Sequence, residues 1–183
     1  MSWSAFKSTM TGVMSNWTYG NSMEGWAAAI TQAYDTAIKS GKTNVTSIPL
    51  QMGQTGAMQG LLISELHSQQ LSKSKTLLDI CGPAVIAYWT GAMIQSIPPG
   101  IPCPGTISNV SVIVAPVTNP GSWSPIPNLP CNNVGIWLDE FIICAKSHAL
   151  TTSGIHTEIS LYPGSPPVPA PCVQSWSGYT VPG

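Results

Sequence analysis

Apolar residues recur at helical spacing through the first half of the chain. The most regular run follows Asn21 and Ser22, where apolar positions three or four residues apart would share one face of a helix. These positions are Met23, Trp26, Ala27, Ile30, Ala33, Tyr34, Ala37 and Ile38. Glu24 lies in the first turn, where the helix dipole favours an acid, and Gly41 is typical of a helix end. The pattern predicts an amphipathic helix that begins at Asn21 or Ser22 and stops before Gly41.

Four other segments have the same periodicity. They are a short helix that starts at Ser2 or Ser4 and breaks at residues 16–20, and the segments 55–70, 75–95 and 133–151. Pro83 lies inside the segment 75–95, and because proline lacks a backbone donor we expect a kink or a new helix start there. The sequence therefore predicts a mainly α fold, a bundle of about four to five helices.

Two stretches rich in proline interrupt this helical pattern. Residues 97–130 contain nine prolines, so they cannot form a long helix. Residues 108–114 within this stretch are rich in β-branched side chains and predict one short strand. Apolar residues are interleaved with the prolines, so we expect 97–130 to be an extended segment that wraps the helices.

The second proline-rich stretch, residues 161–183, predicts a C-terminal extended arm beside a helical domain of residues 1–160. Such an arm cannot form a core alone, so its deletion should leave the helices folded. Four aromatic residues on the proline-rich stretches are candidate interface anchors, because interfaces favour Trp and Tyr at their centres. They are Trp123, Tyr162, Trp176 and Tyr179. We expect the arm to lie on a neighbouring subunit in preference to its own helices.

Charged residues are rare in this chain. They make up 7% of its 183 residues, whereas a soluble domain carries about 25%. All six basic residues are lysines, which excludes both the basic groove that binds nucleic acid and the polybasic cluster that binds acidic membranes. The formal net charge of -1 favours association. We therefore expect a homo-oligomer that binds neither nucleic acid nor membrane.

Targeting signals and cysteine spacing give the expected compartment. The most apolar stretch, residues 77–97, contains Asp79 and Pro83 and is better explained as a buried helix than as a membrane span. The N-terminus lacks the charged start and long apolar run of a signal peptide, so we expect synthesis in the cytoplasm. The five cysteines include no Cys-X-X-Cys pair, which argues against a zinc site and predicts free, mostly buried thiols.

One pair of side chains has the potential for catalysis. Cys144 and His148 lie four residues apart on a predicted helix and share a face, as a thiolate–imidazole pair or two metal ligands would. No third partner stands at a recognisable spacing, so a core cysteine beside a histidine at the polar edge explains the pair better. Gly53, Gly56 and Gly60 match no phosphate-binding loop. The sequence therefore predicts no enzyme activity, no metal and no cofactor.

Several short phrases are shared with a known group of proteins. They are SWSAFKSTM at 2–10, AYDTAIKSG at 33–41, GPAVIAYWTGA at 82–92, IPPGIPCPG at 97–105, SLYPGSPPVPAP at 160–171 and GYTVPG at 178–183. These phrases resemble small virion structural proteins of large contractile-tailed bacteriophages, including marine and cyanobacterial ones. The resemblance implies a component of the particle's neck, tail or baseplate without enzymatic activity. Its partners would be other virion structural proteins and copies of itself, and it would be synthesised in the host cytoplasm.

Two other hypotheses stay open at this point. An extracellular or surface module that binds carbohydrate or mediates adhesion is favoured by three Asn-X-Ser/Thr sequons and seven tryptophans. The missing secretory signal and the odd number of cysteines oppose it. An enzyme that uses Cys144 and His148 is the third hypothesis.

Overall fold

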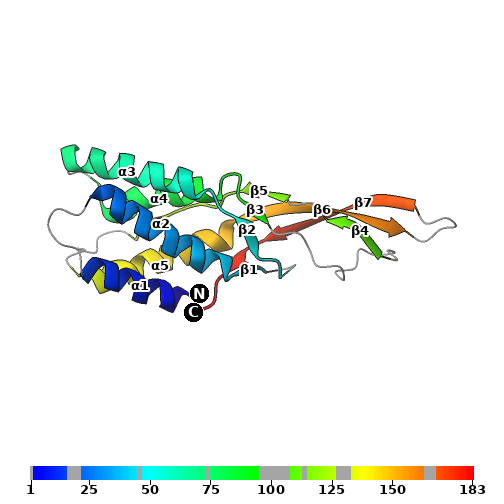
Figure 1. Cartoon of the computed structure of the whole chain (residues 1–183), viewed down its shortest axis with the longest axis horizontal. Helices are drawn as coiled ribbons and strands as arrows, with labels where there is room; N and C mark the ends of the chain where they lie inside the picture. Colours follow the sequence, from blue (N-terminus) through cyan, green and yellow to red (C-terminus); the bar gives the residue numbers. More distant parts are fainter. Residues whose placement is uncertain are drawn as a thin grey trace.

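The computed structural model describes eight segments of the chain. They are residues 2–15, 22–44, 47–72, 75–94, 108–112, 115–126, 133–162 and 168–183. Within these segments, the helices lie together at one end of the molecule, and a long two-stranded hairpin extends from the other end (Figure 1). The molecule is therefore a helical body with a projection.

The five helices of the described segments confirm the predicted helix-rich body. They are α1 (Trp3–Ser15), α2 (Met23–Lys39), α3 (Thr55–Ser72), α4 (Leu77–Trp89) and α5 (Val134–Thr151). Helix α4 ends well before residue 95, which differs from its prediction, and it contains Pro83 within one helix, so no new helix starts there. It ends where Gly91 takes a positive φ of 76°, a conformation that glycine adopts at little cost.

Short polar residues determine where the helices begin. The Ser22 hydroxyl accepts a hydrogen bond from the N–H of Gly25 at 3.0 Å. Thr76 and Asp79 form a reciprocal capping box at the start of α4, and the Asn133 side chain accepts two N–H groups of the first turn of α5. Each cap satisfies donors that the first turn of a helix leaves unpaired, so these starts follow from local sequence.

Aromatic rings fill the centre of the helical body. Phe6 of α1 stacks on Phe141 of α5 with ring centroids 5.3 Å apart. Tyr34 of α2 meets Tyr88 of α4 edge to face at 5.0 Å, and its hydroxyl accepts a hydrogen bond from the Trp89 indole N–H at 3.0 Å. These contacts join four helices through large side chains, whose burial dominates the energetics of a core.

A sheet that the sequence analysis did not predict joins the helices. Its longest strands are β6 (Ser153–Tyr162) and β7 (Val168–Ser177), which pair antiparallel along ten residue pairs to form the hairpin. Ten residues of strand span roughly 30 Å, which explains how far the hairpin extends in Figure 1. The proline-rich C-terminal stretch therefore contains a paired strand.

Shorter strands connect the hairpin to the body. They are β1 (Lys42–Thr43), β2 (Leu50–Met52), β3 (Met93–Ile94), β4 (Ser108–Val112), β5 (Ala115–Asn119) and β8 (Tyr179–Thr180). Strands β5 and β4 pair with successive parts of β6, β5 continues through β3 to β2, and β1 pairs with β8. Strand β4 confirms a strand in the predicted segment 108–114. Much of the predicted wrapping segment 97–130 lies outside the described residues.

The last residues of the chain return to the helical body. The N–H of Trp3 donates a hydrogen bond to the carbonyl oxygen of Pro182 at 3.0 Å, so the two ends lie side by side (Figure 1). Trp176, Tyr179 and Val181 are all buried in the core. This corrects the expectation of a separate arm over residues 161–183: its first residues complete β6, and its last residues belong to the chain's own core.

Candidate interaction surface

Cys144 and His148 lie on the inner face of α5. The structure corrects the placement of His148 at a polar edge, since its side chain is fully buried, with ring centroids 6.4 Å from Trp89 and 6.2 Å from Trp123. Burial lowers the pKa of His148 to about 4, and burial raises the pKa of the Cys144 thiol. Both groups are therefore neutral at pH 7, and neither ring nitrogen of His148 has a hydrogen-bond partner among the described residues.

The structure describes the side chains of two of the five cysteines. Cys81 and Cys144 are free and buried, which confirms the prediction for these two thiols. Cys103, Cys131 and the side chain of Cys172 lie outside the described part. Within the described residues, no group of three or more metal-binding side chains comes together.

The four predicted interface anchors are not gathered on one surface. Trp176 and Tyr179 are buried in the core of their own chain, which corrects their assignment as contacts to a neighbour. Trp123 is half-buried, stands 5.7 Å from the ring of Phe141, and donates its indole N–H to a carbonyl of α4 at 3.2 Å. The side chain of Tyr162 lies outside the described part.

Exposed apolar side chains instead form a stripe along α5. Ile136, Ile143 and Leu150 are 48%, 55% and 55% exposed, although the inner face of the same helix is fully packed. They are spaced by seven residues, which places them nearly in line along a helix. We call these three residues the outer face of α5. The apolar face predicted for this helix is the inner one, and the seven-residue spacing of Ile136, Ile143 and Leu150 is the signal in the sequence for the outer one.

Two opposite charges flank the outer face. Asp139 and Lys146 each follow a stripe residue by three positions, so they lie on the same side of the stripe. The Asp139 carboxylate accepts a hydrogen bond from Lys7 of α1 at 2.6 Å, and both side chains are substantially exposed. Lys146 is also exposed, and no ion pair joins it to another residue of the described segments.

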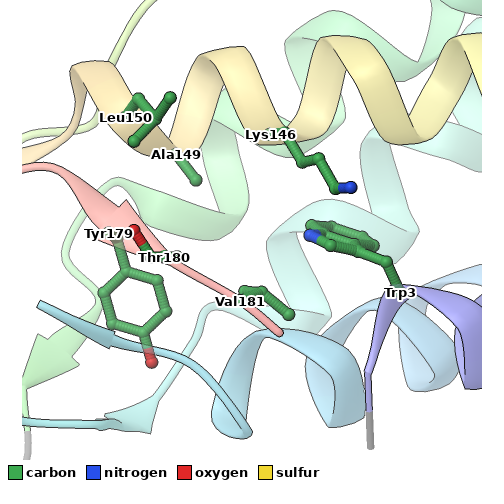
Figure 2. Close-up of a pocket in the computed structure, with 7 residues that line it drawn as sticks. All are labelled: Trp3, Lys146, Ala149, Leu150, Tyr179, Thr180 and Val181. Atoms are coloured by element: carbon green, nitrogen blue, oxygen red, sulfur yellow. The ribbon is translucent and has the colours of Figure 1, made fainter. Parts of the chain in front are cut away.

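A pocket of about 230 Å³ adjoins one end of the stripe (Figure 2). It is lined by Trp3 of α1, by Lys146, Ala149 and Leu150 of α5, and by Tyr179, Thr180 and Val181 of the C-terminal segment. In Figure 2 the Lys146 side chain extends towards Trp3, and Val181 lies between α5 and α2. Because Leu150 and Lys146 belong to both features, the stripe and the pocket form one surface.

The base of the hairpin exposes a second apolar area. Ile155 and Val173 are 44% and 62% exposed. In the register, Ile155 pairs with Ser175 and Thr157 pairs with Val173, so Ile155 and Val173 are diagonal neighbours on one face. Gly154 belongs to the opposite face, where its missing side chain leaves room for the indole of Trp176.

Strand β7 lies at the edge of the sheet that the described residues form. Within the described residues it pairs only with β6, and free edges tend to pair with strands of other chains. Pro169 and Pro171 lack an N–H. A proline in an edge strand occupies a position where the N–H would point away from the paired strand. The half of this edge farther from the helical body is therefore poor in backbone N–H donors. Val173, Ser175 and Ser177 keep their N–H groups on the half near the body.

Within the part of the chain that the structure describes, the apolar outer face and the projecting hairpin are the features that best fit a partner. Among the described helices, none combines the length and the apolar character of a membrane span. In comparisons with known proteins, no family model, no curated protein and no solved structure matched this chain.

Proposed function

We propose that this chain is a structural subunit of a bacteriophage particle, in its neck, tail or baseplate, and that it acts through protein–protein contacts. The observation that carries the proposal is the hairpin of β6 and β7, which extends from the helical body with Ile155 and Val173 exposed. The resemblance to virion structural proteins of contractile-tailed phages gives the kind of assembly. The scarcity of charged residues supports permanent contact with neighbours.

The energetics of the hairpin favour a role in assembly. An isolated two-stranded hairpin is marginally stable in water, and among the described strands β4 and β5 pair with β6, whereas β7 pairs with β6 alone. Covering half-exposed side chains such as Ile155 and Val173 would contribute about 1 kcal/mol each. A neighbouring subunit that packs on this face would therefore stabilise both the hairpin and the assembly.

The experiment is to follow the chain into particles made from the genome that encodes it. Mass spectrometry of purified particles should detect the chain. In a second phage, an Asn-Gly turn replaces residues 157–173, which joins the paired positions His156 and Gln174 and keeps Trp176 and Tyr179 in place. We expect the shortened chain to keep its helical circular dichroism and to be lost from particles.

A matched control is Leu61→Thr, an exposed position on α3 away from the hairpin. This variant should enter particles like the parent chain. The proposal is wrong if the parent chain is absent from purified particles, or if the shortened chain enters them as well as the parent does.

A further inference from the structure

We propose that the outer face of α5 binds the same face of a second copy of the chain, with the two helices antiparallel about a twofold axis at Ile143. The inference rests on the proposed function and names one partner within that assembly. It starts from an apolar helix face that no described element of the chain covers.

The spacing of the outer face is symmetric about its centre. Ile136 precedes Ile143 by seven residues, and Leu150 follows it by seven. In an antiparallel pair of helices, Ile143 would therefore meet Ile143 of the second copy, and Ile136 would meet Leu150 of the second copy. A twofold interface must be self-complementary, and this stripe meets that condition.

The flanking charges select the antiparallel arrangement. Asp139 and Lys146 lie on the same side of the stripe, four residues before and three residues after Ile143. The twofold axis therefore brings Asp139 of each copy to Lys146 of the other, which forms two equivalent ion pairs. In a parallel arrangement the flanking charges of the two copies would lie on opposite sides of the stripe, so neither Asp139 would meet Lys146 of the other copy. The second oxygen of the Asp139 carboxylate is available to Lys146 while the first accepts Lys7.

The size of the stripe predicts a weak dimer in isolation. A standard interface buries about 800 Å² on each partner, and three half-exposed side chains supply only part of that area. The pocket beside Leu150, with Trp3 and Val181, extends the apolar surface at both ends of the twofold pair. We expect dissociation in the micromolar range, and tighter association where other contacts hold the copies together in an assembly.

Sedimentation of the full chain over a dilution series tests the inference. The parent chain should dimerise in a concentration-dependent way. Ile143→Glu places two carboxylates on the axis and should weaken the dimer by about tenfold or more. Leu61→Glu adds the same charge at an exposed apolar position of α3 and should leave the dimer intact. Circular dichroism of each variant establishes that it is folded.

Charge exchange tests the pairing itself. Lys146→Asp alone should weaken the dimer, and the double variant Asp139→Lys with Lys146→Asp should restore it. The variant Ile143→Cys gives a further test, whose expected result cannot arise from misfolding of the variant. It should give a disulfide-linked dimer under mild oxidation, because the two substituted positions meet on the axis. Leu61→Cys, with the native cysteines kept, should not form a disulfide-linked dimer.

A parent chain that stays monomeric at the highest concentration overturns this inference, as does a folded Ile143→Glu variant that dimerises like the parent. Either result leaves the proposed function standing if the chain is found in particles. Absence from particles with an intact α5 dimer would instead contradict the proposed function alone.

Discussion

The hydroxyl of Tyr179 donates a hydrogen bond to the carbonyl oxygen of Ile38 at 2.9 Å, across most of the length of the chain. The same hydroxyl accepts a hydrogen bond from the N–H of Leu50, also at 2.9 Å. One buried oxygen thus joins the C-terminal segment to the end of α2 and to β2. Burial raises the pKa of Tyr179, so the hydroxyl keeps the proton that it donates to Ile38 at neutral pH.

Removal of this hydroxyl should destabilise the fold. Tyr179→Phe leaves the N–H of Leu50 buried without its partner, whereas the carbonyl of Ile38 keeps the N–H of Gly41. The unpaired N–H should cost about 1–3 kcal/mol in the free energy of unfolding. Urea denaturation measures the loss. Thr90→Val removes an exposed hydroxyl that donates to the Ile86 carbonyl and should change the free energy by less than about 0.5 kcal/mol. Equal effects in the two variants would contradict this account.

The C-terminal residues should be essential for folding. Truncation after Ser175 removes Trp176, Tyr179 and Val181 from the core. Burial of a large apolar side chain contributes about 1.5–3 kcal/mol, so the combined loss approaches the total stability of a domain. We expect loss of helical circular dichroism on truncation, whereas replacing residues 157–173 by a turn should preserve it. A truncated chain that stays helical would restore the idea of a dispensable arm.

Gly154 should tolerate no side chain. A Cβ atom at this position would lie 2.5 Å from Nε1 of the Trp176 indole, which is closer than van der Waals contact allows. Gly154→Ala should therefore lower the free energy of unfolding by about 1–3 kcal/mol. Gly60→Ala is the matched control, because nothing lies within 4 Å of its Cβ on α3 and alanine favours a helix by about 0.5–1 kcal/mol. Thermal unfolding should shift in opposite directions for the two variants.

The buried His148 should make stability depend on pH. Its folded pKa of about 4 lies below the ordinary value of 6.5, so between these values the unfolded chain binds a proton that the folded chain does not. Stability should therefore fall as the pH is lowered from 6.5 to 4, by about 3 kcal/mol from this group.

Substitution of His148 isolates this contribution. His148→Leu should be much less sensitive to pH in this range, because the variant has no proton to exclude from the core. His67→Gln alters an exposed histidine of α3 and should keep the pH response of the parent chain. Urea unfolding at pH 7 and at pH 4.5 measures the difference, and identical pH responses in the parent and in His148→Leu would contradict the assignment.

Local sequence was sufficient to predict the helices. The apolar spacing and the Ser22 cap define α2 within a few residues, because both act between neighbours in the chain. Helix α4 ended early because a single glycine turn, Gly91, outweighed the apolar residues after it. The approximate position of each helix could thus be predicted from the sequence, whereas the residues at which it ends depended on single turns such as the one at Gly91.

The hairpin and the core aromatics could not be deduced in the same way. The prolines in 161–183 predicted extended backbone, but strand pairing depends on contacts between distant residues. Trp176 is a core residue because Gly154 leaves room for its indole. Tyr179 is a core residue because its hydroxyl forms hydrogen bonds with Ile38 and Leu50. Aromatic side chains on an extended segment serve a neighbour or their own core equally well, so composition alone could not distinguish the two.

The hydrogen bond between Trp3 and Pro182 has a consequence for biosynthesis. Helix α1 is made before the other described helices, yet its contacts with the C-terminal segment wait until Val181 and Pro182 have left the ribosome. At about 5–20 residues per second, this delay is roughly 10–35 s, during which Trp3 and Phe6 lack part of their final surroundings. Early release of the nascent chain, by a stalled ribosome or a nonsense codon, would therefore yield a helical body without its C-terminal segment. Such a product should be degraded before it can bind a neighbouring subunit.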